Sequence, residues 1–450
     1  MIKGNLIHGL TISLAILTIL FVSTGFHEKD YDFRFSEAGL KPVDIHYGGG
    51  DLKKLSAESC KECHKQEYKD WHQSRHRMAW TNEVFQDGFL VDTQTLCVHC
   101  HAPLKEQTAE VMENFTYYLA RNPRLVEKYT ITSDMSKKNP ENFSHEGVTC
   151  VTCHYRDGQI VSSKKGMKSH DIHHVFENKG LMSCGDCHGM VYDQKPVETI
   201  IRNISDTGSR KKCVNCHLDK SGKTRPSVSH KVQVASTLSQ SKFCANCHEF
   251  NVPAKRDGKV YITDVPMQST YTEWQKFISM GGKGTCQSCH MPKGKHLFRG
   301  AHDLKYLKFS VQIKVISEGD QYVFKIQSIK VGHDHPSGDL FRHFTLEVME
   351  AGEKNYKTIY RIGKVYHLVA NESTGEIREE IKENTSIKPF ETRSIPYKST
   401  GSFRFRLRYH FSSEKDEQRS HLPKARMIRT IVWGSVEKDG SKSHVTYQSE

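Results

Sequence analysis

The sequence predicts two structural classes in one chain. A mainly α-helical and irregular region extends to residue 304, and an all-β, antiparallel and sandwich-like region follows over residues 305–450. All 14 cysteines lie at or before Cys289, so the second region has none. The hydrophobic fraction of the chain, 36%, is low for 450 residues, so the first region needs another source of buried apolar surface. After residue 305, apolar and polar residues alternate with the period of a β-strand.

The first 50 residues divide into an export segment and a tether. Lys3 precedes a stretch without charged residues over 4–26, and small residues suited to cleavage stand at 23–25. We expect residues 1–25 to be a signal peptide or an uncleaved N-terminal anchor, and residues 26–50 to be a tether. In both cases the protein is exported and is periplasmic, membrane-anchored or at the cell surface. The membrane is contacted only through this N-terminal segment, if at all.

Seven times, two cysteines stand three apart with a histidine directly after the second, and these runs use all 14 cysteines. The runs are Cys60-Cys63-His64, Cys97-Cys100-His101, Cys150-Cys153-His154, Cys184-Cys187-His188, Cys213-Cys216-His217, Cys244-Cys247-His248 and Cys286-Cys289-His290. C-x-x-C-H is the attachment sequence for c-type haem, in which the thiols become thioethers and the histidine ligates the iron from one face. A zinc knuckle, a redox dithiol or a disulfide pair explains one such run, but not seven without a spare cysteine.

These runs predict a heptahaem cytochrome c domain over residues 51–304, with seven covalent haem c groups and the seven motif histidines as proximal ligands. Attachment of haem c takes place outside the bacterial cytoplasmic membrane, in agreement with export. The porphyrins also supply the apolar surface that the side chains lack, because short helices and loops can wrap around them.

The formal charge of +13 and the pI near 9.0 do not indicate nucleic-acid binding in an exported haem protein. Each ferric haem adds about −1, because two ionised propionates outweigh the single charge of the iron porphyrin. Seven haems would bring +13 to about +6, so many lysines and arginines are expected to balance propionates. We expect no nucleic-acid partner.

The second axial ligand of each iron must come from outside the motifs, where 20 of the 27 histidines lie. An iron with histidine on both faces is suited to electron transfer, whereas an iron with one open face can bind a small molecule. Candidates lie near a motif or in a loop that can fold back. They are His76, His145, one of His170, His173 and His174, and then His230, His296, His302 and His333. The sequence leaves open which histidine serves which iron.

Two local patterns bear on the fold. Thr270 and Glu273 form a capping-box pattern, which predicts a helix with Trp274 and Phe277 on one side. The clearest strand covers 403–411, where aromatic and aliphatic residues face one way. The residues that face the other way are Arg404, Arg406, Arg408 and His410. This row is either the solvated face of a sheet or a contact for haem propionates or an acidic partner. Strand alternation is also expected from Phe309 onward.

Three stretches resemble the superfamily that holds hydroxylamine oxidoreductase, octahaem tetrathionate reductase and the tetrahaem nitrification cytochrome. They are Cys60-Lys61-Glu62-Cys63-His64 with Tyr68, Trp71, Ser74 and His76; Gly147-Val148-Thr149-Cys150; and Trp274 with Thr285–Pro292, His296 and His302. The resemblance implies haems stacked in parallel and perpendicular pairs, close enough for rapid electron hopping. It also implies that His76 and His302 are distal ligands.

The chain departs from this superfamily in two respects. Pentahaem nitrite reductases commonly have a lysine as the proximal ligand of the active haem, but every motif here ends in histidine. Hydroxylamine oxidoreductases carry eight haems and a tyrosine cross-link to the catalytic one, whereas this chain has seven motifs and no tyrosine that stands out for that role.

The loop over residues 332–338, Gly-His-Asp-His-Pro-Ser-Gly, is similar to a G-H-x-x-P-x-G loop in the strand-rich tails of some multihaem cytochromes. We interpret His333 as a ligand that joins the β region to the haems, with His335 as the alternative. A simple turn built from proline, serine and glycine is the other interpretation of the same residues.

Two functions fit these features. The first is an electron carrier with a chain of bis-histidine haems and unidentified redox partner proteins, either a quinol-oxidising donor or a terminal reductase. The second is an oxidoreductase that acts on a small nitrogen or sulfur compound, such as hydroxylamine, nitrite or tetrathionate, at one open haem. The sequence assigns no catalytic residue and favours the carrier, because the candidate distal histidines are numerous enough to fill every iron.

Overall fold

The structure is a computed structural model of the chain. It describes residues 41–46, 55–61, 64–91, 95–111, 143–163, 232–256, 259–319, 321–371, 376–439 and 442–448. The export segment, most of the tether, Cys63 and the motifs that begin at Cys184 and Cys213 lie outside these residues. The candidate ligands His170, His173, His174 and His230 lie outside them as well. Among the helices that are described, none is both long and apolar enough to cross a bilayer.

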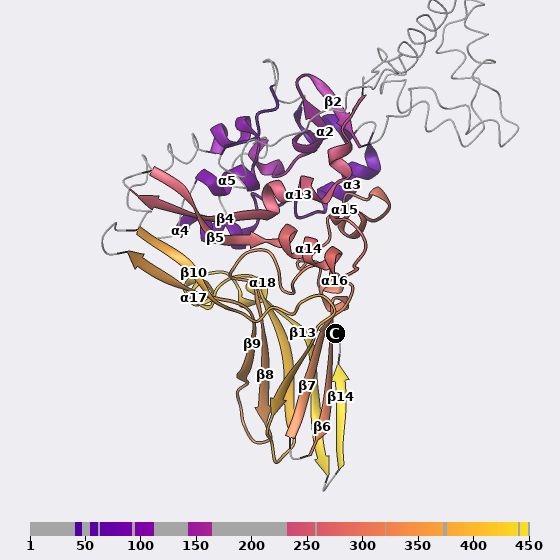
Figure 1. Cartoon of the computed structure of the whole chain (residues 1–450), viewed down its shortest axis with the longest axis vertical. Coiled ribbons are helices and arrows are strands. Elements are labelled where there is room, and N and C mark those ends of the chain that lie inside the picture. The colour runs from indigo at the N-terminus through magenta and orange to yellow at the C-terminus, as the bar shows by residue number, and fades with distance from the viewer. Residues whose placement is uncertain are drawn as a thin grey trace, which may run out of the picture.

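The region with the motifs consists of short helices, short strands and loops (Figure 1). Its helices are α2 (Ala57–Lys61), α3 (Lys65–His72), α4 (Glu83–Val91), α5 (Thr95–His101), η3 (Phe143–Glu146), α8 (Cys150–His154), η4 (Ser236–Ser239), α13 (Ser241–His248), α14 (Thr270–Ser279), α15 (Cys286–His290), η5 (Pro292–Gly294) and α16 (Leu304–Phe309). Its strands are β1 (Tyr155–Arg156), β2 (Gln159–Ser162), β3 (Val232–Val234), β4 (Glu249–Arg256) and β5 (Lys259–Ser269). The sequence did not predict these strands, which form a three-stranded sheet and a hairpin.

The rest of the chain is rich in strands, as expected. They are β6 (Val311–Glu318), β7 (Gln321–Ser328), β8 (His343–Glu350), β9 (Lys357–Asn371), β10 (Glu376–Asn384), β11 (Thr392–Tyr397), β12 (Phe403–His410), β13 (Ile428–Asp439) and β14 (Lys442–Gln448). Two short helices, α17 (Glu414–Arg419) and α18 (Lys424–Met427), lie between β12 and β13. All strand pairs here are antiparallel and form two sheets, of order β10-β9-β8-β12-β13-β14 and β11-β7-β6.

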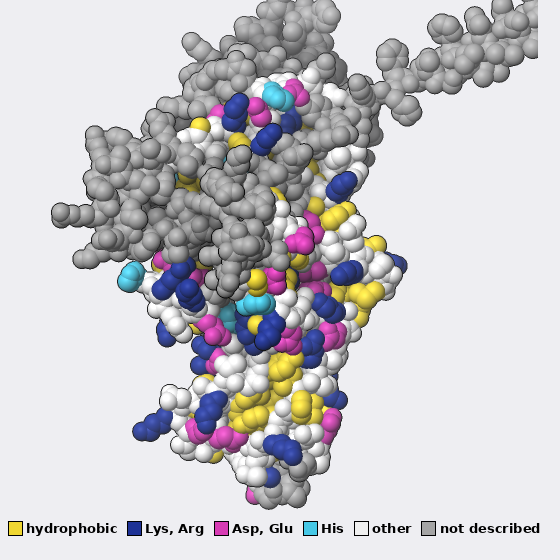
Figure 2. Space-filling view, turned by 60° about the vertical axis from the view of Figure 1, so that its left-hand side comes forward, with side chains coloured by type: hydrophobic (Ala, Val, Ile, Leu, Met, Phe, Trp, Pro, Cys, Tyr) yellow, Lys and Arg dark blue, Asp and Glu magenta, His cyan; other side chains and the backbone are white. Residues whose placement is uncertain are grey.

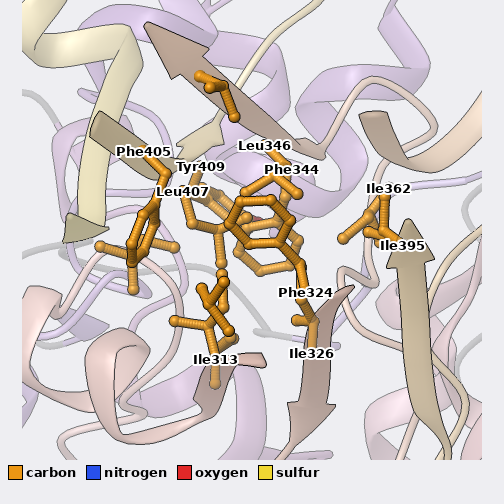
Figure 3. Close-up of a cluster of buried hydrophobic side chains, with 14 of the residues drawn as sticks. Ile313, Phe324, Ile326, Phe344, Leu346, Ile362, Ile395, Phe405, Leu407 and Tyr409 are labelled. Atoms are coloured by element: carbon orange, nitrogen blue, oxygen red, sulfur yellow. The ribbon is translucent and has the colours of Figure 1, made fainter. Parts of the chain in front are cut away.

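The hydrophobic core of the β-rich part lies between its two sheets (Figure 3). Phe324 comes from the smaller sheet, and its ring meets that of Phe405 from the larger sheet edge to face, with centroids 5.4 Å apart. Both side chains are fully buried. The period-2 alternation of β12 therefore points its apolar side inward, as the sequence predicted. This packing makes the β-rich part a sandwich that carries its own core.

One side chain departs from the predicted alternation. Phe309 ends helix α16 instead of beginning a strand, and its side chain is 71% exposed. Asp303 caps this helix, because its carboxylate accepts a hydrogen bond from the backbone N–H of Tyr306 at 3.0 Å. Because the helix that begins at this cap ends only at Phe309, the strand begins two residues later, at Val311.

The arginine row of β12 faces a carboxylate of its own sheet. Arg406 and Arg408 both donate to Glu347 on β8, whose side chain is only 2% exposed. The Nε atoms lie 2.6 Å and 2.8 Å from the two carboxylate oxygens. The row is therefore neither a plainly solvated face nor free for propionates at these two positions. Over the surface in Figure 2, Lys and Arg side chains are interspersed with Asp and Glu.

We predict that Gly434→Ala weakens the larger sheet. A Cβ atom at Gly434 would overlap the carbonyl oxygen of Thr446 on β14 and lie 2.6 Å from the ring of Phe405. Because a backbone oxygen cannot move aside, the substitution should lower the free energy of unfolding of the β-rich part by about 1–3 kcal/mol. Gly401→Ala is the control, because no atom lies within 4 Å of its Cβ position. Equal thermal stability of the two variants would contradict the prediction.

Candidate haem centres

Four of the attachment motifs are described completely, and each forms a short helix that ends at its histidine: α5, α8, α13 and α15. In a helix, residues three and four positions apart share one face. The two thiols and the histidine of C-x-x-C-H therefore project to the same side, where one porphyrin can meet all three. The first motif differs, because His64 lies between α2 and α3.

Three motif histidines are oriented by a backbone carbonyl. The Nδ1 atoms of His101, His154 and His290 lie 2.7, 2.9 and 2.5 Å from the carbonyl oxygens of Ala79, Val161 and Arg299. An Nδ1–H bond of this kind fixes the ring and leaves Nε2 as the free nitrogen for a metal. Burial is the largest cause that lowers the pKa of all three, so the imidazoles are neutral, which is the form that ligates.

Three motif histidines each have a second imidazole opposite. The ring centroids are 6.4 Å apart for His248 and His76, 6.1 Å for His154 and His296, and 6.4 Å for His290 and His333. A bond from a metal to an imidazole nitrogen is about 2 Å, and the ring centre lies about 1 Å behind the nitrogen. Two imidazoles on one iron therefore have centres about 6 Å apart, so each pair leaves the space for one iron. The three partners were all predicted as distal ligands.

The position of His76 explains the glycine of the stretch Gly147–Cys150. Gly147 has φ +59°, and a Cβ there would overlap the carbonyl oxygen of His76 and lie 2.9 Å from that of Arg77. The next residue, Val148, donates its N–H to the His76 carbonyl at 2.9 Å and accepts a bond from Trp71 Nε1 at 2.8 Å. Burial lowers the pKa of His76 to about 3, which keeps the ring neutral. The backbone next to α8 therefore positions His76.

The loop between β7 and β8 separates its two histidines. The Nδ1–H of His333 donates to the carbonyl oxygen of Asp334 at 2.8 Å, and the His333 ring lies opposite that of His290. His335 is buried instead in the β-rich part, where its Nε2 atom lies 3.0 Å from Ser310 Oγ and its ring meets that of Phe344. Only His333 is therefore placed toward a motif, and the alternative at His335 does not fit the geometry.

Two motif histidines and two candidate ligands are not paired in this way among the described residues. Within the described ranges, His64 and His101 have no second imidazole at the spacing of the three pairs. His145 is buried in η3, and the His302 ring stacks on Phe411 with centroids 4.2 Å apart. Burial is again the largest cause that lowers the pKa of His145 and of His302.

Cysteines from different motifs are neighbours. Cys60 and Cys150 lie close enough for each thiol to shift the pKa of the other, and two more neighbouring pairs link further motifs. These join Cys100 to Cys247 and Cys244 to Cys286. Because each thiol is an expected porphyrin attachment point, motifs with neighbouring thiols would hold neighbouring porphyrins. Which motifs are neighbours could not be predicted from the sequence.

The residues present suit a haem, which takes two ligands per iron from the protein and carries its own carboxylates. Within the described ranges no three His, Cys, Asp or Glu side chains gather as a cage for a bare ion. The Nε atom of Arg342 is buried and has no partner, although the same guanidinium pairs with Asp339 at 3.2 Å. A propionate is a suitable acceptor for such a donor. Sequence reasoning also missed Phe85, whose ring stacks on His101 with centroids 3.6 Å apart.

Comparisons with known proteins agree with this fold. The chain matches no protein-family model and no curated protein significantly. Among solved structures, a penta-haem cytochrome c552 from Thermochromatium tepidum overlaps 86% of this chain and 99% of its own chain, with a TM-score of 0.52 and 17% identity. The chain thus has the fold of a multihaem cytochrome c.

Two further structures overlap smaller parts. Superoxide reductase in the oxidised state covers 23% of this chain and 77% of its own, at 15% identity. Superoxide reductase (neelaredoxin) from Archaeoglobus fulgidus covers 25% and 86%, at 17% identity. Both have a TM-score of 0.15, which establishes no common fold.

We predict that Gly147→Ala displaces His76. The left-handed φ and the overlap with the His76 carbonyl together cost about 1–3 kcal/mol, which a shift of the His76 backbone can relieve. One low-spin haem should become wholly or partly high-spin in the electron paramagnetic resonance spectrum. Gly300→Ala is the control, because no atom lies within 4 Å of its Cβ position. A spectrum identical to that of the parent protein would exclude this role for Gly147.

Proposed function

We propose that the protein is a heptahaem c-type cytochrome that carries electrons through a chain of bis-histidine haems. The observation that carries the proposal is the set of three imidazole pairs with centroid distances of 6.1–6.4 Å. With both axial positions taken, such an iron has no vacant position for substrate and changes only its oxidation state. When bound, haem c supplies this one-electron couple, and the chain supplies the ligands, their orientation and the exclusion of water.

The neighbouring cysteines suggest the route. The proximity of Cys247 to Cys100 and of Cys244 to Cys286 makes the sixth motif the neighbour of both the second and the seventh. The first and third motifs adjoin through Cys60 and Cys150. Cys247 also lies close enough to raise the pKa of Cys153, after the larger effect of burial. The five described motifs therefore form one connected array, with the sixth at its centre.

The spread of reduction potentials along this route would come from the surroundings of each iron. The carbonyl acceptors at three proximal histidines raise the basicity of the imidazoles and favour the ferric state. The degree of burial differs among the sites. Where burial disfavours the charge of the ferric haem, it favours the ferrous state instead. We expect low and separated midpoint potentials.

The alternative function, reduction or oxidation of a small nitrogen or sulfur compound, needs one open iron. Its best location is the second motif, because His101 has no opposing imidazole among the described residues and lies near the charges of Asp339 and Arg342. Arginine beside a haem is suited to binding an anion such as nitrite. The imidazole pairs at three of the five described motifs, each of which would close one iron, favour the carrier.

The wider assignments are proposals too. Gly147, with its role beside His76, supports membership of the superfamily that holds hydroxylamine oxidoreductase and octahaem tetrathionate reductase. Export to the periplasm or the cell surface follows from the N-terminal segment and from haem c attachment. The partners would be a redox donor and a redox acceptor protein, and no nucleic acid.

The carrier proposal predicts weak binding of carbon monoxide. A pyridine haemochrome assay should give seven haems per chain, and the binding of carbon monoxide is then measured against this haem content. If all seven irons are six-coordinate, as the carrier proposal requires, the reduced protein should then bind carbon monoxide at well below one haem per molecule, as measured by optical titration. Stoichiometric binding at one haem, together with rapid turnover of nitrite or hydroxylamine, would establish the enzyme alternative instead.

We also predict that His333→Ala converts one low-spin haem to high-spin. The His333 ring faces His290 at 6.4 Å, and alanine cannot replace its nitrogen on an iron. His335→Ala is the matched control from the same loop. It removes the bond to Ser310 and should reduce stability, but it should leave every haem low-spin. An unchanged low-spin signal in His333→Ala would remove His333 from the set of ligands.

A further inference from the structure

The loop that carries His333 is attached to both parts of the molecule. On the β-rich side, the N–H of His335 donates to the carbonyl of Ile387 at 2.8 Å, and the N–H of Ile387 donates back at 2.9 Å. On the side of the haem motifs, Ser337 contacts α14, whose position between the two parts is visible in Figure 1. His333 precedes both attachments by only a few residues, so they limit where its ring can lie.

The contact with α14 depends on a buried carboxylate. One oxygen of Glu273 accepts a hydrogen bond from Ser337 Oγ at 2.5 Å, and the other accepts from Ser269 Oγ at 2.8 Å. Thr270 Oγ1 also lies 2.9 Å from Ser337 Oγ. The predicted capping box is therefore wrong in detail. Glu273 does not cap the N–H of Thr270 but turns inward to the loop, and Ser269 is the N-cap residue.

A buried lysine balances this carboxylate. Lys364 on β9 lies 3.3 Å from Glu273, and the two side chains are 5% and 4% exposed. Lys364 also donates to Ser269 Oγ at 3.0 Å. Burial tends to raise the pKa of Glu273, but Lys364 and the hydroxyl donors outweigh it, and the pKa lies below its ordinary value. The two side chains form a buried salt bridge, and each would lack an ionic partner without the other.

Two more contacts fix the same loop on the same side. Gln268, at the end of β5, donates to Asp339 at 2.5 Å. Gly332 packs on the ring of Phe277 from α14, where an added Cβ would lie 3.1 Å from the ring. The loop is thus attached to β5 and α14 before and after His333, and two of the carboxylates in these attachments, Glu273 and Asp339, belong to ion pairs.

We propose that Glu273 and Lys364 are positioning residues, which hold the loop so that His333 stays at axial distance from the iron of His290. This inference rests on the proposed ligation of one iron by His290 and His333. A buried ion pair with excellent geometry is a weak source of stability, but it specifies one arrangement of the elements that carry its members. Here those elements are α14 and β9, from the two parts of the molecule.

The test compares three variants of the complete haem-loaded protein. Glu273→Gln keeps the shape of the side chain but leaves the Lys364 charge unpaired, and Lys364→Met leaves that of Glu273 unpaired. Ser337→Ala is milder, because it cuts only the link from the loop to the carboxylate. Each should turn a fraction of one haem high-spin, and added imidazole should restore the low-spin signal. Glu273→Gln should also raise one midpoint potential, because a negative charge near the iron is lost.

Glu347→Gln is the matched control. Glu347 is an equally buried carboxylate, paired with arginines in the β-rich part, and no candidate ligand depends on it. It should lower the melting temperature without any change in spin state or potential. If Glu273→Gln accumulates too poorly to be measured, the spin state of the haems in Ser337→Ala decides whether the positioning role holds.

The outcomes separate this inference from the proposed function. A high-spin haem in His333→Ala, with fully low-spin haems and unchanged potentials in Glu273→Gln, Lys364→Met and Ser337→Ala, would overturn the positioning role alone. Low-spin haems in His333→Ala would overturn the ligation itself, and the positioning role with it. A high-spin fraction in Glu347→Gln equal to that in Glu273→Gln would show a general loss of structure and would also overturn the inference.

Discussion

The spacing that two imidazoles need in order to hold one iron between them is the constraint on which the proposed haem centres depend. A centroid distance of about 6 Å leaves little freedom, because both nitrogens must reach the metal at about 2 Å. The chain meets this condition with residues far apart in sequence, such as His248 with His76 at 6.4 Å. The short helices, the carbonyl acceptors and the glycine at 147 all serve to hold rings in place.

The same constraint also bears on the role of the β-rich part. It has a core of its own, in which Phe324 and Phe405 pack between two sheets. It nevertheless reaches the haem motifs through the loop of His333, and Glu273 and Lys364 form a buried ion pair across the boundary. A ligand contributed from a separate core would make one haem centre depend on how the two parts sit against each other.

Buried charge is used in two different ways. Glu347 and its arginines satisfy one another within a single sheet, so this cluster affects only the β-rich part. Glu273 joins elements from both parts, where a lost charge would alter the placement of a loop. A buried ion pair therefore has a local effect when both partners lie on one sheet, as at Glu347. It has a long-range effect when the partners lie on elements of different parts, as at Glu273.

The sequence by itself was enough to predict the attachment sites and proximal histidines, because C-x-x-C-H is a local pattern that one helical turn can form. It also determined the inward side of β12, because period-2 alternation depends only on the pleat. It gave His76, His296 and His333 as candidates but not their partners, since pairing joins residues up to about 170 positions apart. It misplaced Phe309, because the strand alternation was followed past the local N-cap at Asp303, which begins a helix. It also missed the role of Glu273, because Lys364 on β9 is a tertiary neighbour that no local pattern encodes. The choice between His333 and His335 was likewise made only by the fold, which buries one ring against Ser310 and turns the other toward His290.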